Sequence, residues 1–181
     1  PDGTTIAFTY KGDIYTVPVA GGRAMQITTN PAYDTAPVWS PDSKRIAFAS
    51  DRMGSLDVYI VAKDGGEPRR LTTHSGSETP LAFTDAGHVL FSAGIMPSAE
   101  AVVFPSNGQF NQVYRVSVEG GRPTMISSMP MECISINKEG AMLYQDKKGY
   151  EDYWRKHHVS PIARDIWMYT PGKEPQYRQL T

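Results

Sequence analysis

The sequence predicts an all-β fold, namely a segment of a β-propeller with about four four-stranded antiparallel blades, the first of them incomplete. Three observations predict this fold. A unit of roughly 40 residues recurs four times, four landmarks keep the same order in each unit, and the apolar segments are as short as strands. A unit of this length with four short strands is typical of one propeller blade. A β-sandwich is the alternative, but a sandwich has no need for ordered landmarks at a regular period.

The first landmark is a turn, rich in Pro-Asp or Asp-Gly, followed by a short apolar triplet. In the second unit the turn is Ser-Pro-Asp-Ser at 40–43, where proline presets φ and aspartate can bond the backbone ahead of it. The triplets end on an aromatic residue, at Phe8, Phe48, Phe91 and Tyr144. We expect these four rings at equivalent positions on second strands, buried between neighbouring blades.

The other three landmarks follow in a fixed order. The second is a polar, a branched and an aromatic residue: Asp13-Ile14-Tyr15, Asp57-Val58-Tyr59, Gln112-Val113-Tyr114 and Asp165-Ile166-Trp167. The third is a double glycine at 21–22, 65–66 and 120–121, which the last unit replaces with Pro-Gly at 171–172. Glycine supplies the positive φ of a tight hairpin between third and fourth strands. The fourth is an aliphatic residue and a hydroxyl: Ile27-Thr28, Leu71-Thr72, Ile126-Ser127 and Leu180-Thr181.

Several predicted strands are apolar on successive residues, as in Tyr59-Ile60-Val61, which favours sheets covered on both faces. We expect a single partial propeller domain over 1–181, with blades at about 1–33, 34–76, 77–129 and 130–181. The first blade lacks its first strand, so fifteen strands are predicted. We expect either that further blades complete the ring or that the chain is an excised segment.

Insertions interrupt the third and fourth units, at about 94–110 and 147–163. The second insertion gathers aromatic and basic side chains: Tyr150, Tyr153, Trp154, Arg155, Lys156, His157 and His158. Adjacent histidines on an extended chain point to opposite sides and no metal-ligand spacing is present, which disfavours a metal site. The cluster also has the composition to bind a nucleic acid or a carboxylate, or to contact another domain or subunit. The favoured interpretation is that Tyr153 and Trp154 anchor the loop to the propeller, while Arg155 and the two histidines bond neighbouring carbonyls or carboxylates.

Charge and composition exclude several function classes. The chain has 18 Lys and Arg against 19 Asp and Glu, a net charge of −1, which disfavours nucleic acid and anionic membranes as partners. Its one cysteine excludes an internal disulfide, and no apolar run is long enough to span a membrane.

No catalytic, cofactor-binding or metal-binding residue is predicted. A Gly-x-Ser-x-Gly elbow is absent, and His74-Ser75 lacks an orienting acid, which favours a turn. We expect Asp51-Arg52 to form a turn or a local ion pair of little energy, and Cys133 to be a buried thiol. We expect packing roles for the methionines at 125, 129, 131 and 142.

The repeat resembles that of a known group of propeller proteins. Residues 36–52, APVWSPDSKRIAFASDR, are similar to the propeller repeat shared by TolB, the prolyl-oligopeptidase group and tricorn protease. Residues 150–158, YEDYWRKHH, with RDIW at 164–167, resemble the first propeller of tricorn-type serine peptidases. Members of that family carry two propellers, a PDZ domain and a catalytic region with Ser and His.

The resemblance implies a non-catalytic part of a six-bladed first propeller, which scaffolds the enzyme or gates peptide access to a catalytic domain outside this chain. It implies further blades, PDZ and peptidase domains as partners, peptides as substrates, and a homo-oligomer, and it favours the periplasm. It carries no catalytic residue onto these 181 positions. The alternatives are a TolB-like protein-binding module without activity, and the propeller of a prolyl-oligopeptidase-type hydrolase with a downstream Gly-x-Ser-x-Gly elbow.

Overall fold

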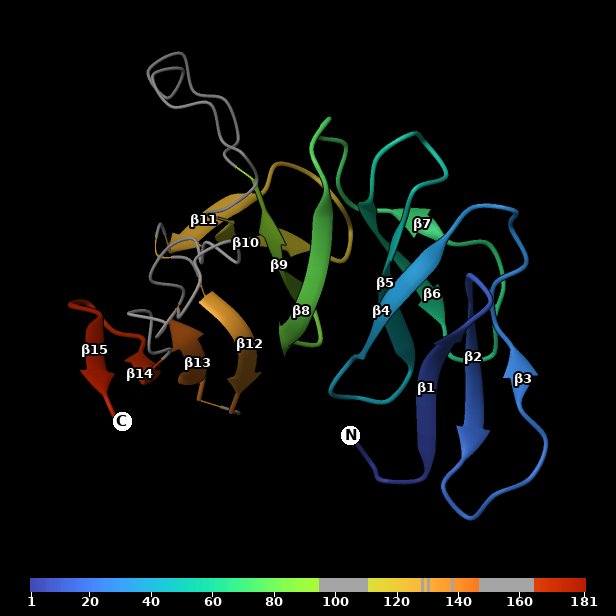
Figure 1. Ribbon diagram of the computed structural model, residues 1–181, viewed down its shortest axis with the longest axis horizontal. Coiled ribbons are helices and arrows are strands. Elements are labelled where there is room, and N and C mark those ends of the chain that lie inside the picture. Colours follow the sequence, from blue (N-terminus) through green and yellow to red (C-terminus); the bar gives the residue numbers. More distant parts are fainter. Residues whose placement is uncertain (95–110, 128, 130, 138, 147–164) are drawn as a thin grey trace, which may run out of the picture.

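A computed structural model describes residues 1–94, 111–127, 129, 131–137, 139–146 and 165–181. In these ranges the chain forms fifteen strands in four antiparallel sheets, which follow one another around an open arc (Figure 1). The predicted fold class is therefore confirmed. Within the same ranges, no helix is long and apolar enough to cross a membrane.

Each sheet is a meander of neighbouring strands, and we call the sheets blades 1 to 4 in chain order. Blade 1 contains β1 (Thr5–Tyr10), β2 (Asp13–Pro18) and β3 (Met25–Gln26). Blade 2 contains β4 (Asp34–Trp39), β5 (Arg45–Ser50), β6 (Asp57–Ala62) and β7 (Arg69–Arg70). Blade 3 contains β8 (Glu78–Asp85), β9 (His88–Ala93), β10 (Gln112–Ser117) and β11 (Thr124–Ser127). Blade 4 contains β12 (Met131–Ile136), β13 (Met142–Asp146), β14 (Ile166–Thr170) and β15 (Gln176–Gln179).

The repeated aromatic residues occupy one register in all four blades. The cross-strand pairs are Phe8 with Tyr15, Phe48 with Tyr59, Phe91 with Tyr114, and Tyr144 with Trp167. In blades 1 to 3 the paired rings stack, with centroids 5.7–5.9 Å apart. Equivalence of the four positions is thus confirmed.

Burial of the same positions is confirmed in three blades and wrong in the first. Phe48, Phe91 and Tyr144 are buried, whereas Phe8 is only half-buried. The aromatic position faces the preceding blade, because Phe48 packs in one cluster with Ile14 and Ile27 of blade 1. No described blade precedes β1, so the ring of Phe8 keeps part of its contact with solvent.

The turn landmarks adopt the predicted conformations. All six residues of the double glycines have positive φ, between 83° and 128°. In the turn after β4, the hydroxyl of Ser40 donates to the carboxylate of Asp42 at 2.5 Å, and the same carboxylate accepts from the amide of Lys44 at 3.1 Å. These contacts fix the hairpin between β4 and β5.

The hydroxyl landmark ties the end of the repeat to its third strand in blades 1, 2 and 4. The hydroxyls of Thr28, Thr72 and Thr181 accept from the backbone amides of Ile14, Val58 and Ile166 at 2.8–2.9 Å. The aliphatic residue before each hydroxyl donates its amide to the carbonyl of the same third-strand residue, at 2.8 Å in all three blades. The repeat therefore keeps a backbone contact that side-chain type alone does not reveal.

The core consists of three apolar clusters, one between each pair of adjacent blades. Alternate residues of one strand serve two clusters: Phe48 of β5 packs toward blade 1, and Ala47 packs toward blade 3. The near-continuous burial of β5 and β6 follows from this arrangement.

The first strands contact one another along the inside of the arc, β4 with β8 and β8 with β12. Each carries a register shift, and Ala36 and Cys133 adopt φ of 51° and 52° in two of them. The expected burial of Cys133 is wrong, since its side chain is exposed. The bulge between Glu132 and Ser135 breaks the alternation that would have placed the thiol in the core.

Candidate functional site

The outward face of blade 1 is apolar and uncovered. We call the leading face the surface formed by five side chains of β1 and β2: Ile6, Phe8, Tyr10, Tyr15 and Val17. Ile6 and Tyr10 are 50% and 53% exposed, and the other three are half-buried. The positions of blade 2 in the same register are buried, with Ile46 0% exposed where blade 1 has Ile6.

Blade 4 has a matching uncovered surface on its other side. We call the trailing face the surface of Leu143, Ile166 and Leu180. Their exposed fractions are 44–45%, whereas the equivalent Leu90 and Val113 of blade 3 are fully buried. Both faces have the composition of an interblade contact, and each lacks a described blade against it.

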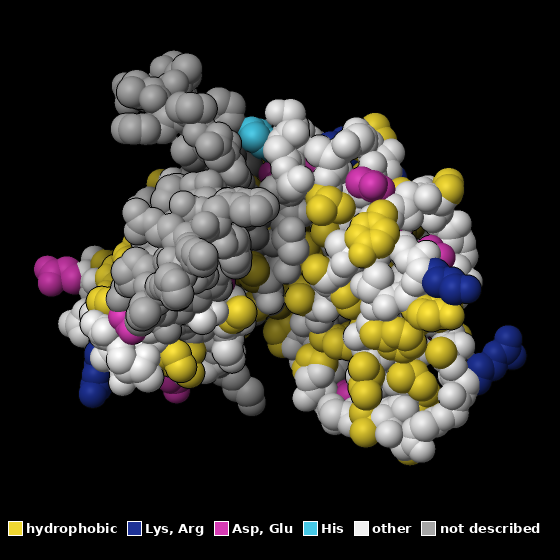
Figure 2. Space-filling model, viewed as in Figure 1, with side chains coloured by type: hydrophobic (Ala, Val, Ile, Leu, Met, Phe, Trp, Pro, Cys, Tyr) yellow, Lys and Arg dark blue, Asp and Glu magenta, His cyan; other side chains and the backbone are white. Residues whose placement is uncertain are grey.

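The two faces are candidate interaction surfaces, because neighbouring side chains on each are apolar and exposed. Figure 2 shows hydrophobic side chains gathered over the part of the surface formed by β1 and β2. Burying one large apolar side chain contributes roughly 1.5–3 kcal/mol, so a covering blade would gain substantially from the leading face alone.

A buried ion pair lies where blade 2 begins. Nη2 of Arg52 donates to both carboxylate oxygens of Asp34, at 2.9 and 3.1 Å, and Nε donates to Ser50 Oγ at 2.8 Å. The guanidinium also lies 4.6 Å from the ring centre of Tyr59. Asp34 is completely buried. This pair joins β4 to the end of β5.

Of the two structures expected for Asp51-Arg52, the turn is confirmed, and the ion pair of Arg52 forms with Asp34 instead of Asp51. Asp51 does take part in a turn: its carbonyl accepts from Gly54 at 2.8 Å, and its carboxylate accepts from the amide of Tyr33 at 2.7 Å. Arg52 turns instead to a carboxylate 18 residues earlier, because the antiparallel pairing places Asp34 opposite Ser50.

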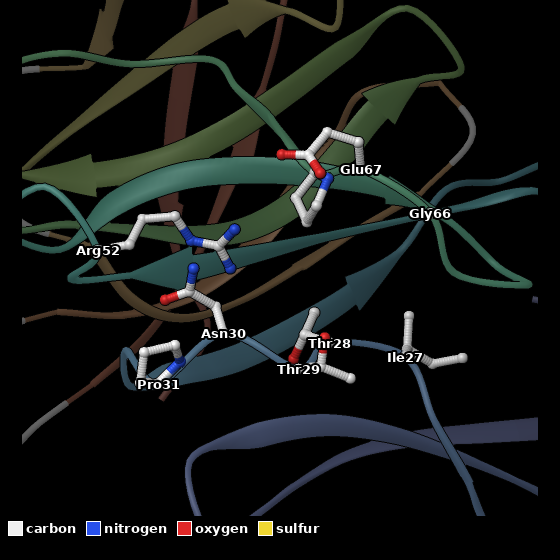
Figure 3. A pocket seen from close by; sticks show the side chains of 9 residues that line it. Ile27, Thr28, Thr29, Asn30, Pro31, Arg52, Gly66 and Glu67 are labelled. Carbon is white, nitrogen blue, oxygen red and sulfur yellow. The ribbon is translucent and has the colours of Figure 1, made fainter.

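A polar pocket of about 220 Å³ lies beside this ion pair. In Figure 3 the guanidinium of Arg52 and the amide of Asn30 point toward each other within it. The charge of Arg52 is already committed to Asp34, which leaves the pocket little net attraction for an anion. Its lining residues are Ile27, Thr28, Thr29, Asn30, Pro31, Arg52, Gly66, Glu67 and Pro68.

A second polar cluster occupies the junction of blades 2 and 3. Nη2 of Arg70 donates to Asp57 Oδ2 at 2.8 Å, and Asp57 is completely buried. Glu78, the first residue of β8, is also completely buried, and neither of its carboxyl oxygens has a hydrogen-bond partner among the described residues. The sequence analysis used Asp57 only as a repeat landmark and did not single out Glu78.

The electrostatics of these acids follow from burial. Burial raises the pKa of Asp57, and the hydrogen bond and charge of Arg70 oppose that shift. Burial is also the main cause that raises the pKa of Glu78 to about 7; the hydroxyl of Thr72 opposes the shift and the charge of Asp57 adds to it. Alignment of the repeats could have identified Glu78, because it places an acid at the same position in two successive units, Asp34 and Glu78.

The weaker sequence candidates take structural positions. His74 lies in the turn between β7 and β8, where Nδ1 accepts from the amide of Gly76 at 3.0 Å. Met131 and Met142 are buried and Met129 packs against the same cluster, as expected. Met125 is 52% exposed, so the expected packing role is wrong for this residue.

The insertion residues Tyr153, Trp154, Arg155, His157 and His158 lie outside the described residues, so their predicted roles stay predictions. In the part of the chain that the structure describes, no three His, Cys, Asp or Glu side chains are grouped in a way that holds a metal ion.

The sequence matches one known domain family and is similar to known peptidases. The sequence model of the tricorn protease N-terminal β-propeller domain matches residues 2–181. The chain is 25% identical over 169 residues to tricorn protease homolog 1 of Streptomyces coelicolor, covering 93% of this chain and 15% of that protein. It is 32% identical over 107 residues to the uncharacterized peptidase YuxL of Bacillus subtilis, covering 52% of this chain and 16% of that protein. The chain thus spans about a sixth of these relatives.

Solved structures agree on the fold. A putative TolB from Agrobacterium tumefaciens superposes with a TM-score of 0.68 at 23% identity, over 98% of this chain and 61% of that one. TolB from Acinetobacter baumannii superposes with a TM-score of 0.69 at 18% identity, over 100% of this chain and 41% of that one. At these identities the likeness shows the propeller fold alone.

Proposed function

The chain belongs to the family of tricorn protease N-terminal β-propeller domains, and on that premise we propose that it is the non-catalytic propeller portion of a larger serine peptidase. In this role residues 1–181 scaffold the enzyme or gate the access of peptides to a catalytic region elsewhere in the polypeptide. Relatives several times longer than the chain support the proposal, since they leave room for such a region.

The observation that carries the proposal is the pair of uncovered apolar faces. The leading face presents Ile6 where blade 2 buries Ile46, and the trailing face presents Leu143 where blade 3 buries Leu90. A blade packed on each face would bury these side chains as blades 1 to 4 bury one another. We therefore propose that 1–181 is one partial propeller domain, completed by further blades of the same polypeptide.

Peptide hydrolysis tests the catalytic half of the proposal. A panel of fluorogenic peptides is offered to the purified 181-residue chain and to the full-length polypeptide. We expect turnover only from the full-length polypeptide, because a nucleophile with its base is what this reaction requires and no such pair is predicted in the chain. Turnover by the isolated chain that is lost on a point change within it contradicts the proposal.

Substrate length separates scaffolding from gating. If the propeller gates access, removing it from the full-length polypeptide raises hydrolysis of long peptides relative to short ones. If the propeller only scaffolds, its removal lowers both rates together. An unchanged rate for every peptide length contradicts both roles.

The alternative is a protein-binding propeller without an enzyme, like the TolB proteins whose fold it shares. The full-length reading frame discriminates between them. A PDZ and a peptidase region after Thr181 supports the first function, and a Gly-x-Ser-x-Gly elbow there indicates a prolyl-oligopeptidase-type hydrolase. A complete frame that contains neither region supports the binding module.

A further inference from the structure

The junction of blades 2 and 3 buries two acidic side chains against one described basic side chain that bonds to either of them. Asp57 from β6 and Glu78 from β8 are both completely buried, and Arg70 from β7 is the one described cation bonded to either. Burying an unpaired carboxylate is costly, and a buried acid without a partner usually keeps its proton instead.

At the junction of blades 1 and 2, the equivalent buried acid is neutralised by a cation. Asp34 and Glu78 are equivalent: each begins the first strand of its blade, and each donates its amide to a carbonyl of the previous blade at 2.7 Å. Asp34 is neutralised by Arg52, which lies two residues after its cross-strand partner Ser50.

Blade 3 has no arginine at the position that corresponds to Arg52. The cross-strand partner of Glu78 is Ala93, and two residues later the sequence has Ile95 instead of arginine. The insertion offers no replacement, because residues 95–110 contain no Lys, Arg or His.

The described residues of this junction carry several buried polar atoms without a hydrogen-bond partner. Among the described residues, both carboxyl oxygens of Glu78, Oδ1 of Asp57, Nε of Arg70 and Nε2 of His74 are buried without a hydrogen-bond partner. Oδ1 of Asp57 is thus an unused acceptor, and a neutral Glu78 carries the one hydroxyl that such an acceptor needs.

We propose that Glu78 is protonated in the folded chain and shares its proton with Asp57, which makes the junction of blades 2 and 3 a pH-sensitive contact. The groups that face the pair are Arg70 of β7, His74 of the following turn and the phenol of Tyr59 on β6. Arg52 and Asp34 also act on that phenol, and they neutralise each other.

Ionisation of Glu78 then opens the junction from one side. Two buried carboxylates would share a single guanidinium, and their repulsion acts where the amide of Glu78 donates to the carbonyl of Leu56. The folded chain holds the proton of Glu78 more tightly than the unfolded chain does. The contribution of this proton to stability is therefore complete below the ordinary pKa range of glutamate. It is lost as the pH rises through about 7.

Thermal unfolding of the 181-residue chain from about pH 5 to about pH 8 tests the proposal. We expect the wild-type melting temperature to fall by roughly 5 °C or more over this interval. The variant Glu78→Gln keeps the shape and the donor of the neutral acid. Its melting temperature should therefore fall much less over the same interval. A variant that retains the wild-type fall overturns the proposal.

The matched control is Asp34→Asn, at the equivalent position with its arginine in place. It should lower the melting temperature at both ends of the interval and leave the fall unchanged. Amide hydrogen exchange, corrected for the intrinsic rate at each pH, gives a local readout: the protection factor of the Glu78 amide should fall at high pH, while that of the Asp34 amide should not. An equal fall at both positions overturns the proposal.

Two further measurements test the proposal. The first needs no variant that folds, and the second asks whether a metal cation neutralises the pair instead of a proton. With an isotope label on the glutamate carboxyl carbons, the wild-type chain should show one glutamate that titrates near neutrality. If every glutamate titrates in its ordinary range, the proposal fails. It also fails if Na⁺, K⁺ or Ca²⁺ stabilises the wild type, but not Glu78→Gln, at high pH, since the pair then holds a cation.

Discussion

Replacing Arg52 with methionine is the sharpest test of what stabilises the start of blade 2. Methionine keeps the apolar length of the side chain but removes the guanidinium. Two bonds to Asp34 and one to Ser50 are lost, together with the cation 4.6 Å from the ring centre of Tyr59. Asp34, which is completely buried, is left as an unpaired charge.

The magnitude follows from that burial. Removing one partner of a buried ion pair costs about 3–5 kcal/mol, because the remaining charge stays desolvated. For a chain of this size, a loss in that range lowers the melting temperature by roughly 10 °C. Urea unfolding followed by tryptophan fluorescence gives the free energy of unfolding directly.

The control is Arg69→Met, which breaks the ion pair of Arg69 with Glu119. Those side chains are 49% and 74% exposed, so the loss should be about 1 kcal/mol or less. Adding Asp34→Asn to Arg52→Met should recover part of the stability, since it removes the stranded charge. If Arg52→Met costs no more than Arg69→Met, or if the double variant recovers nothing, the buried pair does not have the role assigned to it.

Three other outcomes are expected. Thr72→Val keeps the shape of the side chain and leaves the amide of Val58 without an acceptor, so the free energy of unfolding in urea should fall by about 1–3 kcal/mol; an unchanged value contradicts the role of the hydroxyl landmark. Phe91→Ala should cost about 3–5 kcal/mol. Phe8→Ala should cost clearly less in this chain, but a similar amount in a longer polypeptide whose preceding blade covers β1; equal losses in the isolated chain would contradict an uncovered leading face. Trp154→Ala should lower the melting temperature or loosen the second insertion, whereas a chelator should change neither; a chelator-sensitive melting temperature would favour a metal at the adjacent histidines.

Much of the fold was readable because a propeller repeats local contacts. The positive φ of a double glycine, the Ser-Pro-Asp turn and the ring pair of Phe48 and Tyr59 each depend on residues close in the sequence. Four copies of the same landmarks then separated signal from coincidence. The strand count, the equivalence of the aromatic positions and the hairpin glycines could therefore be predicted without coordinates.

The candidate site was less readable because its contacts join residues far apart in the chain. Arg52 looked like a partner for the adjacent Asp51, yet the pairing of β4 with β5 gives it to Asp34. Cys133 looked apolar and internal, yet a bulge turns it outward. Such outcomes depend on register, which one inserted residue can change.

The sequence alone determined which residues form blades, because turn chemistry and strand propensity act over a few neighbouring positions. Only the tertiary structure decided which faces of those blades are covered. Ile6 and Ile46 occupy the same place in the repeat, and Asp34 and Glu78 occupy another. The isoleucines differ in burial because only Ile46 has a described blade against it, and the two acids differ in charge balance because only Asp34 has an arginine beside it. Desolvation depends on what packs against a side chain rather than on its local sequence.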